Sequence, residues 1–221
     1  MFSRTVIKIV YVNQALSDIN SRFKANFLLL NLNKTHYLQF RTKNHVDNTI
    51  DINYLNKPIA NHPYTKFLGL VVDDILTCNN HIDQLISSLN SACYAIRAVN
   101  EILSKNVLRM LYFLYVHSII SYGIIFWGNT PNSIKTFRMQ KKVLRIINKS
   151  KKMDSYRELF KSMEILPLYS PYLFSLLMYV VNNKHLFTKT LEFHNHGTRS
   201  AINFHLPTTN LTKYQKGTYY T

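Results

Sequence analysis

The stretch KFLGLVVDDILTCNNHIDQL, residues 66–85, lies where the pattern of the sequence changes. Before it, residues 35–40 and 49–55 alternate between polar and apolar side chains, which is typical of strands. After it, apolar residues recur every three or four positions from Ile82 to Val99, which predicts one continuous helix face. The sequence therefore predicts an α+β chain, in which a small antiparallel sheet near the N-terminus is followed by a mostly helical array.

Other helices are predicted from the same periodicity, at 13–25 before the strands and at about 104–120, 131–149, 154–162 and 170–184 after them. Glycine and proline residues separate the later segments. We therefore divide the chain into a small-sheet region over 1–76, a helical region over 77–190 and an irregular tail over 191–221. The first region has too few strands for a self-sufficient sheet, since a small isolated sheet is only marginally stable.

The composition is that of a folded, strongly basic protein. Of the 221 residues, 47% are hydrophobic and 13% aromatic, which makes disorder a poor description. Lysine and arginine outnumber aspartate and glutamate 27 to 11, which gives a formal charge of +16. Such a surplus favours a polyanionic partner, with nucleic acid as the first candidate, although a merely basic protein is the alternative on charge alone.

Cellular location is constrained by three features of the sequence. The two cysteines, Cys78 and Cys93, have no paired spacing, so neither a disulfide framework nor a cysteine-rich zinc site is predicted. The N-terminal apolar run is broken by Lys8 and has no cleavage signal, so we expect an intracellular protein, cytoplasmic or nuclear, that is not secreted. Residues 111–127 are the best membrane candidate, but they fall short of a spanning length, and we expect a helix buried on most sides and no membrane partner.

Asp73 and Asp74 are adjacent acids behind an apolar run, as a metal-dependent polymerase would need. Such a pair converges on metal ions when a tight turn between two strands holds it, but residues 75–80 supply no second strand. They offer turn or helix N-cap residues instead, namely Thr77, Asn79 and Asn80. We therefore predict no metal site at this pair and expect the two carboxylates to point apart.

The strongest binding pattern is the basic segment IKTFRMQKKVLRIINKSKK, residues 134–152. Five cations recur at spacings of four and three, which places them along one helical stripe: Arg138, Lys142, Arg145, Lys149 and Lys152. Four apolar residues lie largely off that stripe: Phe137, Val143, Leu144 and Ile147. Because this segment contains no acid, we predict that the stripe binds the phosphates of a duplex without sequence preference; a solvated helix face is the alternative.

Five segments, taken in order, carry a resemblance to a known family. They are RFKANFLLLNLNKTHYLQF (22–40), KFLGLVVD (66–73), HI (81–82), YGIIFWGN (122–129) and MQKKVLRII (139–147). Together they resemble the reverse transcriptase of jockey-like non-LTR retrotransposons, over nearly the whole chain. The resemblance implies that residues 1–76 are a partial palm with the primer-grip hairpin and that residues 77–190 are a thumb-like region.

The resemblance also implies which functional parts are present. The family's metal-binding carboxylates lie upstream of the segment that matches residues 13–40, so the sequence is expected to begin after them. Phe67, Leu68 and Gly69 match the primer grip, where we expect packed side chains and a glycine whose backbone conformation a side chain would block. Lys34 matches a palm lysine thought to donate a proton to pyrophosphate, but without the metals a solvated turn lysine describes it better. The family usually has tryptophan at the position of Cys78.

The expected function is therefore that of a fragment of a retrotransposon RNA-directed DNA polymerase. It would lack the catalytic aspartates, be inactive alone and need no cofactor, whereas the full-length parent would use Mg²⁺. Its partners would be an RNA or DNA template–primer duplex, bound by the thumb-like helices, and the missing palm and fingers of the parent. The alternative is a non-enzymatic nucleic-acid-binding or interaction protein derived from such an element.

Overall fold

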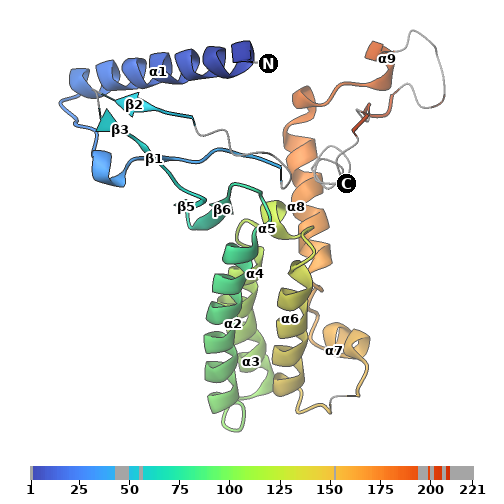
Figure 1. Cartoon of the computed structure of the whole chain (residues 1–221). Helices are drawn as coiled ribbons and strands as arrows, with labels where there is room; N and C mark the ends of the chain where they lie inside the picture. The colour runs from blue at the N-terminus through green and yellow to red at the C-terminus, as the bar shows by residue number, and fades with distance from the viewer. Residues whose placement is uncertain are drawn as a thin grey trace. The chain divides into compact units, whose positions relative to one another are not determined.

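The computed structural model describes residues 2–42, 50–54, 57–151, 153–193, 199, 202–205 and 208–209. The chain divides into two compact units, Met1–Thr77 and Cys78–Thr221 (Figure 1). The named strands lie in the first unit, and the second is built from helices. The predicted α+β class is confirmed.

The first unit begins with a long helix and continues with short strands. Its elements are α1 (Phe2–Ala25), the 3-10 turn η1 (Leu32–Lys34), β1 (His36–Tyr37), β2 (Asn53–Tyr54), β3 (Lys57–Pro58), β4 (Ala60–Asn61), β5 (Tyr64–Phe67) and β6 (Leu70–Asp73). The strands form three two-stranded ladders, of which β2–β3 and β5–β6 are antiparallel, as predicted. The third ladder, β1–β4, is parallel, which the sequence did not indicate.

A small apolar cluster holds the first unit together. Ile52, Tyr54 and Ile59 are its buried members, and Leu16 of α1 packs against them. The Tyr54 hydroxyl donates a hydrogen bond to Asn20 Oδ1, so β2 is tied to α1 by a polar contact as well. With so few buried side chains, this unit depends on polar contacts for a large share of its stability.

The β5–β6 hairpin turns through Leu68 and Gly69, which have φ values of 46° and 81°. Positive φ at both loop residues defines the type I′ geometry that suits a two-residue hairpin. The expectation for Gly69 is therefore confirmed. The expected packing is wrong for Phe67 and Leu68, whose side chains are 65% and 73% exposed, whereas Leu70, also expected to be packed, is half-buried. Both side chains lie at the tip of the hairpin, where the described residues of this unit leave them uncovered.

The second unit is a helical array. Its elements are α2 (Asn79–Val99), α3 (Lys105–Leu111), the π-helical segment η2 (Tyr112–His117), α4 (Ser118–Ser121), α5 (Ile124–Trp127), α6 (Ser133–Ile147), α7 (Tyr156–Ser162), α8 (Tyr169–Asn182), the 3-10 turn η3 (Lys184–Leu186) and α9 (Thr190–Phe193). Helices α2 and α6 pack together, and η2 and α4 also contact α2 (Figure 1). Helix α7 contacts α6, and α5 contacts α8.

Helix α2 carries the face that its periodicity predicted. The buried residues on it include Ile82, Leu85, Leu89, Cys93 and Ile96. Its start differs from the prediction, because the N-cap is Cys78 in the left-handed conformation, with no side-chain cap. The expected caps are therefore wrong: Thr77 lies one residue too early, and Asn79 is already the first helical residue.

The segment from α3 through η2 to α4 forms the helix predicted at 104–120, with a π-helical middle. Every fourth residue on one side is buried: Leu108, Tyr112, Val116 and Ile120. On the other side, Leu114 and Tyr115 are exposed, so the expectation of a helix buried on most sides is wrong. The physical reason is that its packing partners, α2 and α6, leave one side of this helix uncovered.

A buried glutamine joins three parts of the helical unit. Gln140 of α6 is 1% exposed, and its Nε2 donates to the Tyr112 hydroxyl at 2.7 Å and to the Leu166 carbonyl at 2.9 Å. Its Oε1 accepts a hydrogen bond from the Leu168 amide at 2.9 Å. Burial raises the pKa of Tyr112 to about 12, although the hydrogen bond from Gln140 lowers it. A fully hydrogen-bonded polar group of this kind fixes one arrangement of the helices around it.

Candidate nucleic-acid interface

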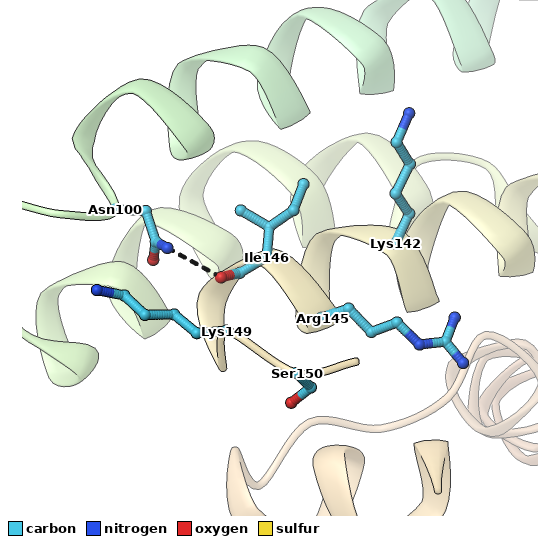
Figure 2. A pocket seen from close by; sticks show the side chains of 6 residues that line it. All are labelled: Asn100, Lys142, Arg145, Ile146, Lys149 and Ser150. Carbon is cyan, nitrogen blue, oxygen red and sulfur yellow. Dashed lines mark hydrogen bonds between the residues drawn. The ribbon is translucent and has the colours of Figure 1, made fainter. Parts of the chain in front are cut away.

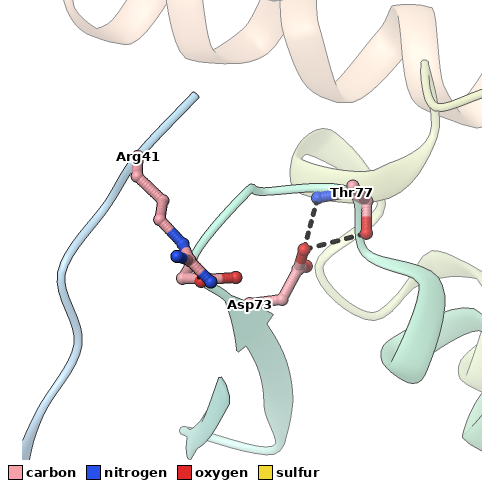
Figure 3. A network of polar contacts seen from close by, with 4 residues as sticks. Arg41, Asp73 and Thr77 are labelled. Carbon is pink, nitrogen blue, oxygen red and sulfur yellow. Dashed lines mark hydrogen bonds and ion pairs between the residues drawn. The ribbon is translucent and has the colours of Figure 1, made fainter. Parts of the chain in front are cut away.

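The acid pair of the first unit is bound by protein groups (Figure 3). Asp73 Oδ2 accepts hydrogen bonds from the Thr77 amide and from the Thr77 hydroxyl, both at 2.8 Å. Asp74 Oδ2 lies 2.6 Å from Arg41 Nε, and both acids are only 8% exposed. Both carboxylates are therefore engaged by protein groups, which does not favour a shared metal ion.

No group of three or more metal-ligating side chains is placed to hold a metal ion in the part of the chain that the structure describes. Nor does any helix among those residues have the length and apolar character to cross a membrane. Lys34, the palm lysine by resemblance, is the last residue of η1 and is exposed. Asn31 caps that turn by accepting a hydrogen bond from the Asn33 amide at 3.1 Å.

Helix α6 has an apolar side, as its sequence predicted. Val143, Leu144 and Ile147 are buried on it. Phe137 is half-buried and stacks on Phe160 of α7, with 6.1 Å between the ring centroids. These contacts fix the rotation of the helix about its axis, and with it the direction in which the cations face.

The opposite side of α6 carries positive charge. Arg138 and Lys142 are exposed and Arg145 is half-buried. Within the described residues, none of the three forms an ion pair. Lys141 is different, because its Nζ lies 4.7 Å from the Phe137 ring centroid and 5.1 Å from that of Tyr156. A cation over aromatic faces is already stabilised there.

The expectation that nothing relieves the charge of this segment needs correction. Lys149 Nζ lies 2.8 Å from Glu101 Oε2, and Lys135 Nζ lies 3.1 Å from Asp83 Oδ1. Helices α2 and α6 run side by side in the same direction. Their packing brings each lysine next to an acid that is 48 or 52 residues away in the sequence. Lys152, the fifth predicted cation, lies outside the described residues. Among the described residues, the stripe therefore contains three cations without an ion-pair partner and one, Lys149, that is paired with an acid.

An open pocket of about 490 Å³ lies at the C-terminal end of α6. It is lined by Asn100, Lys142, Arg145, Ile146, Lys149 and Ser150. Figure 2 shows the side chains of Lys142, Arg145 and Lys149 leaving the backbone in different directions around it. Asn100 Nδ2 donates to the Ile146 carbonyl at 3.0 Å. Sequence reasoning found the three cations but missed Asn100 and Glu101, which the packing of α2 against α6 brings near them, and Ser150, which follows Lys149 directly.

The carbonyl groups at this helix end are hydrogen-bonded. The Ser150 amide donates to Arg145 O at 3.0 Å and the Lys149 amide to Ile146 O at 3.1 Å, which is the Schellman arrangement. Lys149 occupies the left-handed position of this motif, with φ of 52°, where glycine is the usual residue. These hydrogen bonds satisfy two of the last carbonyl groups, and the negative end of the helix dipole favours the cations placed there.

Comparisons with protein-family models, with curated proteins and with solved structures find no match.

Proposed function

We propose that this chain is a nucleic-acid-binding fragment of a non-LTR retrotransposon reverse transcriptase and contacts the phosphates of a template–primer duplex through α6. The family assignment rests on the five ordered sequence segments. The observation that carries the binding proposal is the cationic face of α6, made of Arg138, Lys142 and Arg145. These side chains lie opposite the buried side of the helix and have no ion-pair partner in the described part of the chain.

Like charges spaced three or four residues apart on a helix repel each other, so this face destabilises the free helix slightly. Phosphates relieve that repulsion and release their condensed counterions, which makes binding salt-dependent. The logarithm of affinity falls with the logarithm of salt concentration by roughly 0.9 per phosphate contact with duplex DNA. The five-cation stripe would give a slope of about −4.5, whereas the three cations without ion pairs give about −2.7.

The test is fluorescence anisotropy of a labelled RNA–DNA hybrid duplex over a salt series. We expect the double variant Lys142→Ala, Arg145→Ala to make the slope shallower by about 1.8 without changing sequence preference, because phosphate contacts carry no sequence information. The matched control is Lys105→Ala, Lys161→Ala, which removes two exposed lysines from α3 and α7 and leaves α6 intact. Equal slopes for the two double variants would refute a role for α6.

We further propose that the chain transfers no nucleotide by itself. Two-metal phosphoryl transfer needs carboxylates that converge on the metal ions, whereas Asp73 binds Thr77 and Asp74 binds Arg41. In a primer-extension assay with template, primer, Mg²⁺ and nucleotides, we expect no incorporation above background. Incorporation that disappears in an Asp73→Asn, Asp74→Asn variant would overturn this part of the proposal.

The alternative, a non-enzymatic interaction protein derived from such an element, is favoured by helix α8. This helix leaves a row of large apolar side chains exposed: Leu173, Phe174, Leu177, Met178 and Val181. Contiguous exposed apolar surface is typical of interaction sites. Sedimentation velocity separates the two functions: a complex that forms through α8 dissociates in a Phe174→Ser, Leu177→Ser variant and is unaffected by the α6 double variant.

A further inference from the structure

The pocket at the end of α6 has an acid as well as cations beside it. Glu101 follows α2 and its ion pair holds Lys149, which lines the pocket together with Lys142 and Arg145. The two side chains of the ion pair are 77% and 58% exposed, respectively. An ion pair this exposed is worth only about 0.2–1 kcal/mol. A phosphate can therefore displace it at small cost.

We propose that Glu101 is a built-in competitor of the nucleic-acid phosphate: it binds Lys149 in the free chain and gives it up when a backbone phosphate enters the pocket. This inference rests on the proposed function, because it concerns the same face of the protein. Arg145 supports it, since it lines the same pocket and forms no ion pair among the described residues. A guanidinium with unused donors and two neighbouring lysines is the chemistry that recognises a phosphodiester.

The backbone of Lys149 supports the same role. A side chain in the left-handed conformation costs about 1–2 kcal/mol relative to ordinary helical backbone, and glycine avoids that cost. Lys149 nevertheless stands there, at the rim of the pocket. In the free chain, Glu101 binds the Nζ of Lys149. The lysine is therefore paired when no ligand is present and is still exposed enough to reach one.

The decisive variant is Glu101→Gln, which removes the competing charge and keeps the shape of the side chain. We expect this variant to bind the labelled RNA–DNA hybrid about two- to fivefold more tightly, because binding no longer has to break the exposed ion pair. The salt slope becomes steeper by about 0.9, because Lys149 then neutralises a phosphate without first leaving an acid. Both changes are opposite in sign to those of the α6 double variant.

Removal of any acid raises the net charge, so two matched controls are needed. Asp83→Asn and Glu164→Gln make the same charge change, and each removes the acid of an exposed ion pair, to Lys135 and Arg109 respectively. Neither Lys135 nor Arg109 lines the pocket, whereas Lys149, the partner of Glu101, does. We expect these controls to tighten binding by less than Glu101→Gln and to leave the salt slope unchanged. The gain from Glu101→Gln should also vanish in a Lys149→Ala background, as a double-mutant cycle would show.

The outcomes separate this inference from the proposed function. If the parent chain binds with the expected salt slope but Glu101→Gln behaves like Asp83→Asn, the competitor role is refuted and phosphate binding by α6 stands. A gain that persists in the Lys149→Ala background refutes it as well, because Glu101 would then act through the general field of the protein. A parent chain that binds no duplex overturns both proposals.

Discussion

The acid pair of the first unit and the cationic face of α6 are both clusters of like charge, but their surroundings differ. Asp73 and Asp74 are buried, and each carboxylate is held by a protein partner. Arg138 and Lys142 are exposed and have no ion-pair partner in the described ranges. A buried charge must be paired to be tolerated, whereas a set of exposed, unpaired like charges costs little and can be used for a ligand. The first cluster therefore contributes to stability, and we propose that the second binds a ligand.

The largest effect is expected for a variant that removes one acid of the buried pair. Asp73→Ala removes the acceptor of both hydrogen bonds from Thr77, so we expect the free energy of unfolding of the first unit to fall by about 2 kcal/mol. Hydrogen exchange of the β5 and β6 amides measures this locally, and duplex affinity should change little. The control is Asp51→Ala, an exposed acid of the same unit, with an effect within about 0.5 kcal/mol. Equal effects of the two variants would mean that Asp73 has no structural role.

A smaller effect is expected at the two left-handed residues that close α6 and α7. Glu164 has φ of 50° and closes α7 as Lys149 closes α6, each with a charged side chain in a left-handed position. We expect Lys149→Gly and Glu164→Gly each to stabilise the helical unit by about 0.5 kcal/mol, since relief of the backbone outweighs loss of an exposed ion pair. Urea denaturation measures this. Only Lys149→Gly should weaken duplex binding; a similar loss in Glu164→Gly would argue against a specific role for Lys149.

The smallest effect concerns two histidines of the helical unit, His81 of α2 and His117 of η2. Burial lowers the pKa of His81 and of His117, so the folded state binds their protons less readily than the unfolded state does. Their contribution to stability is therefore present above the unfolded pKa of about 6.5 and is lost as the pH falls below it. We expect the melting temperature of the helical unit to decrease from about pH 7.5 to about pH 5.5. A His81→Phe variant should show a smaller decrease, and an unchanged pH dependence would exclude His81 as a contributor.

Local periodicity was enough to predict much of the helical unit. The buried face of α2 and the apolar side of α6 follow from apolar residues that recur with the 3.6-residue period of a helix, which is visible in the sequence. Helix α1 was only half predicted, as 13–25, although it spans Phe2–Ala25. Its first half has a weak apolar pattern, but residues 1–25 contain no glycine or proline to stop a helix.

The remaining differences come from tertiary packing. The Lys149–Glu101 pair depends on α2 and α6 running in the same direction, which no local pattern reveals. The exposure of Phe67 depends on what covers the hairpin tip, and an apolar residue is buried only where another layer reaches it. The partners of the acid pair follow the same rule, since Arg41 is 33 residues from Asp74. In this chain, the charged candidate residues could be identified from the sequence, whereas their ion-pair partners depend on tertiary packing.

The π-helical segment η2 limits the lengths that this part of the chain can have. Four residues turn an α-helix by about 40° more than one revolution, so a row of side chains at every fourth position drifts off one face. Leu108, Tyr112, Val116 and Ile120 are nevertheless all buried, because the wider turns of η2 hold more residues and reverse that drift. Deletion of one exposed residue here, such as Leu114, would place Tyr112 and Ile120 seven positions apart, which keeps both on one face of a regular α-helix. The segment can therefore lose one residue and become a regular α-helix, whereas a second deletion would turn Ile120 by about 100° away from the buried face.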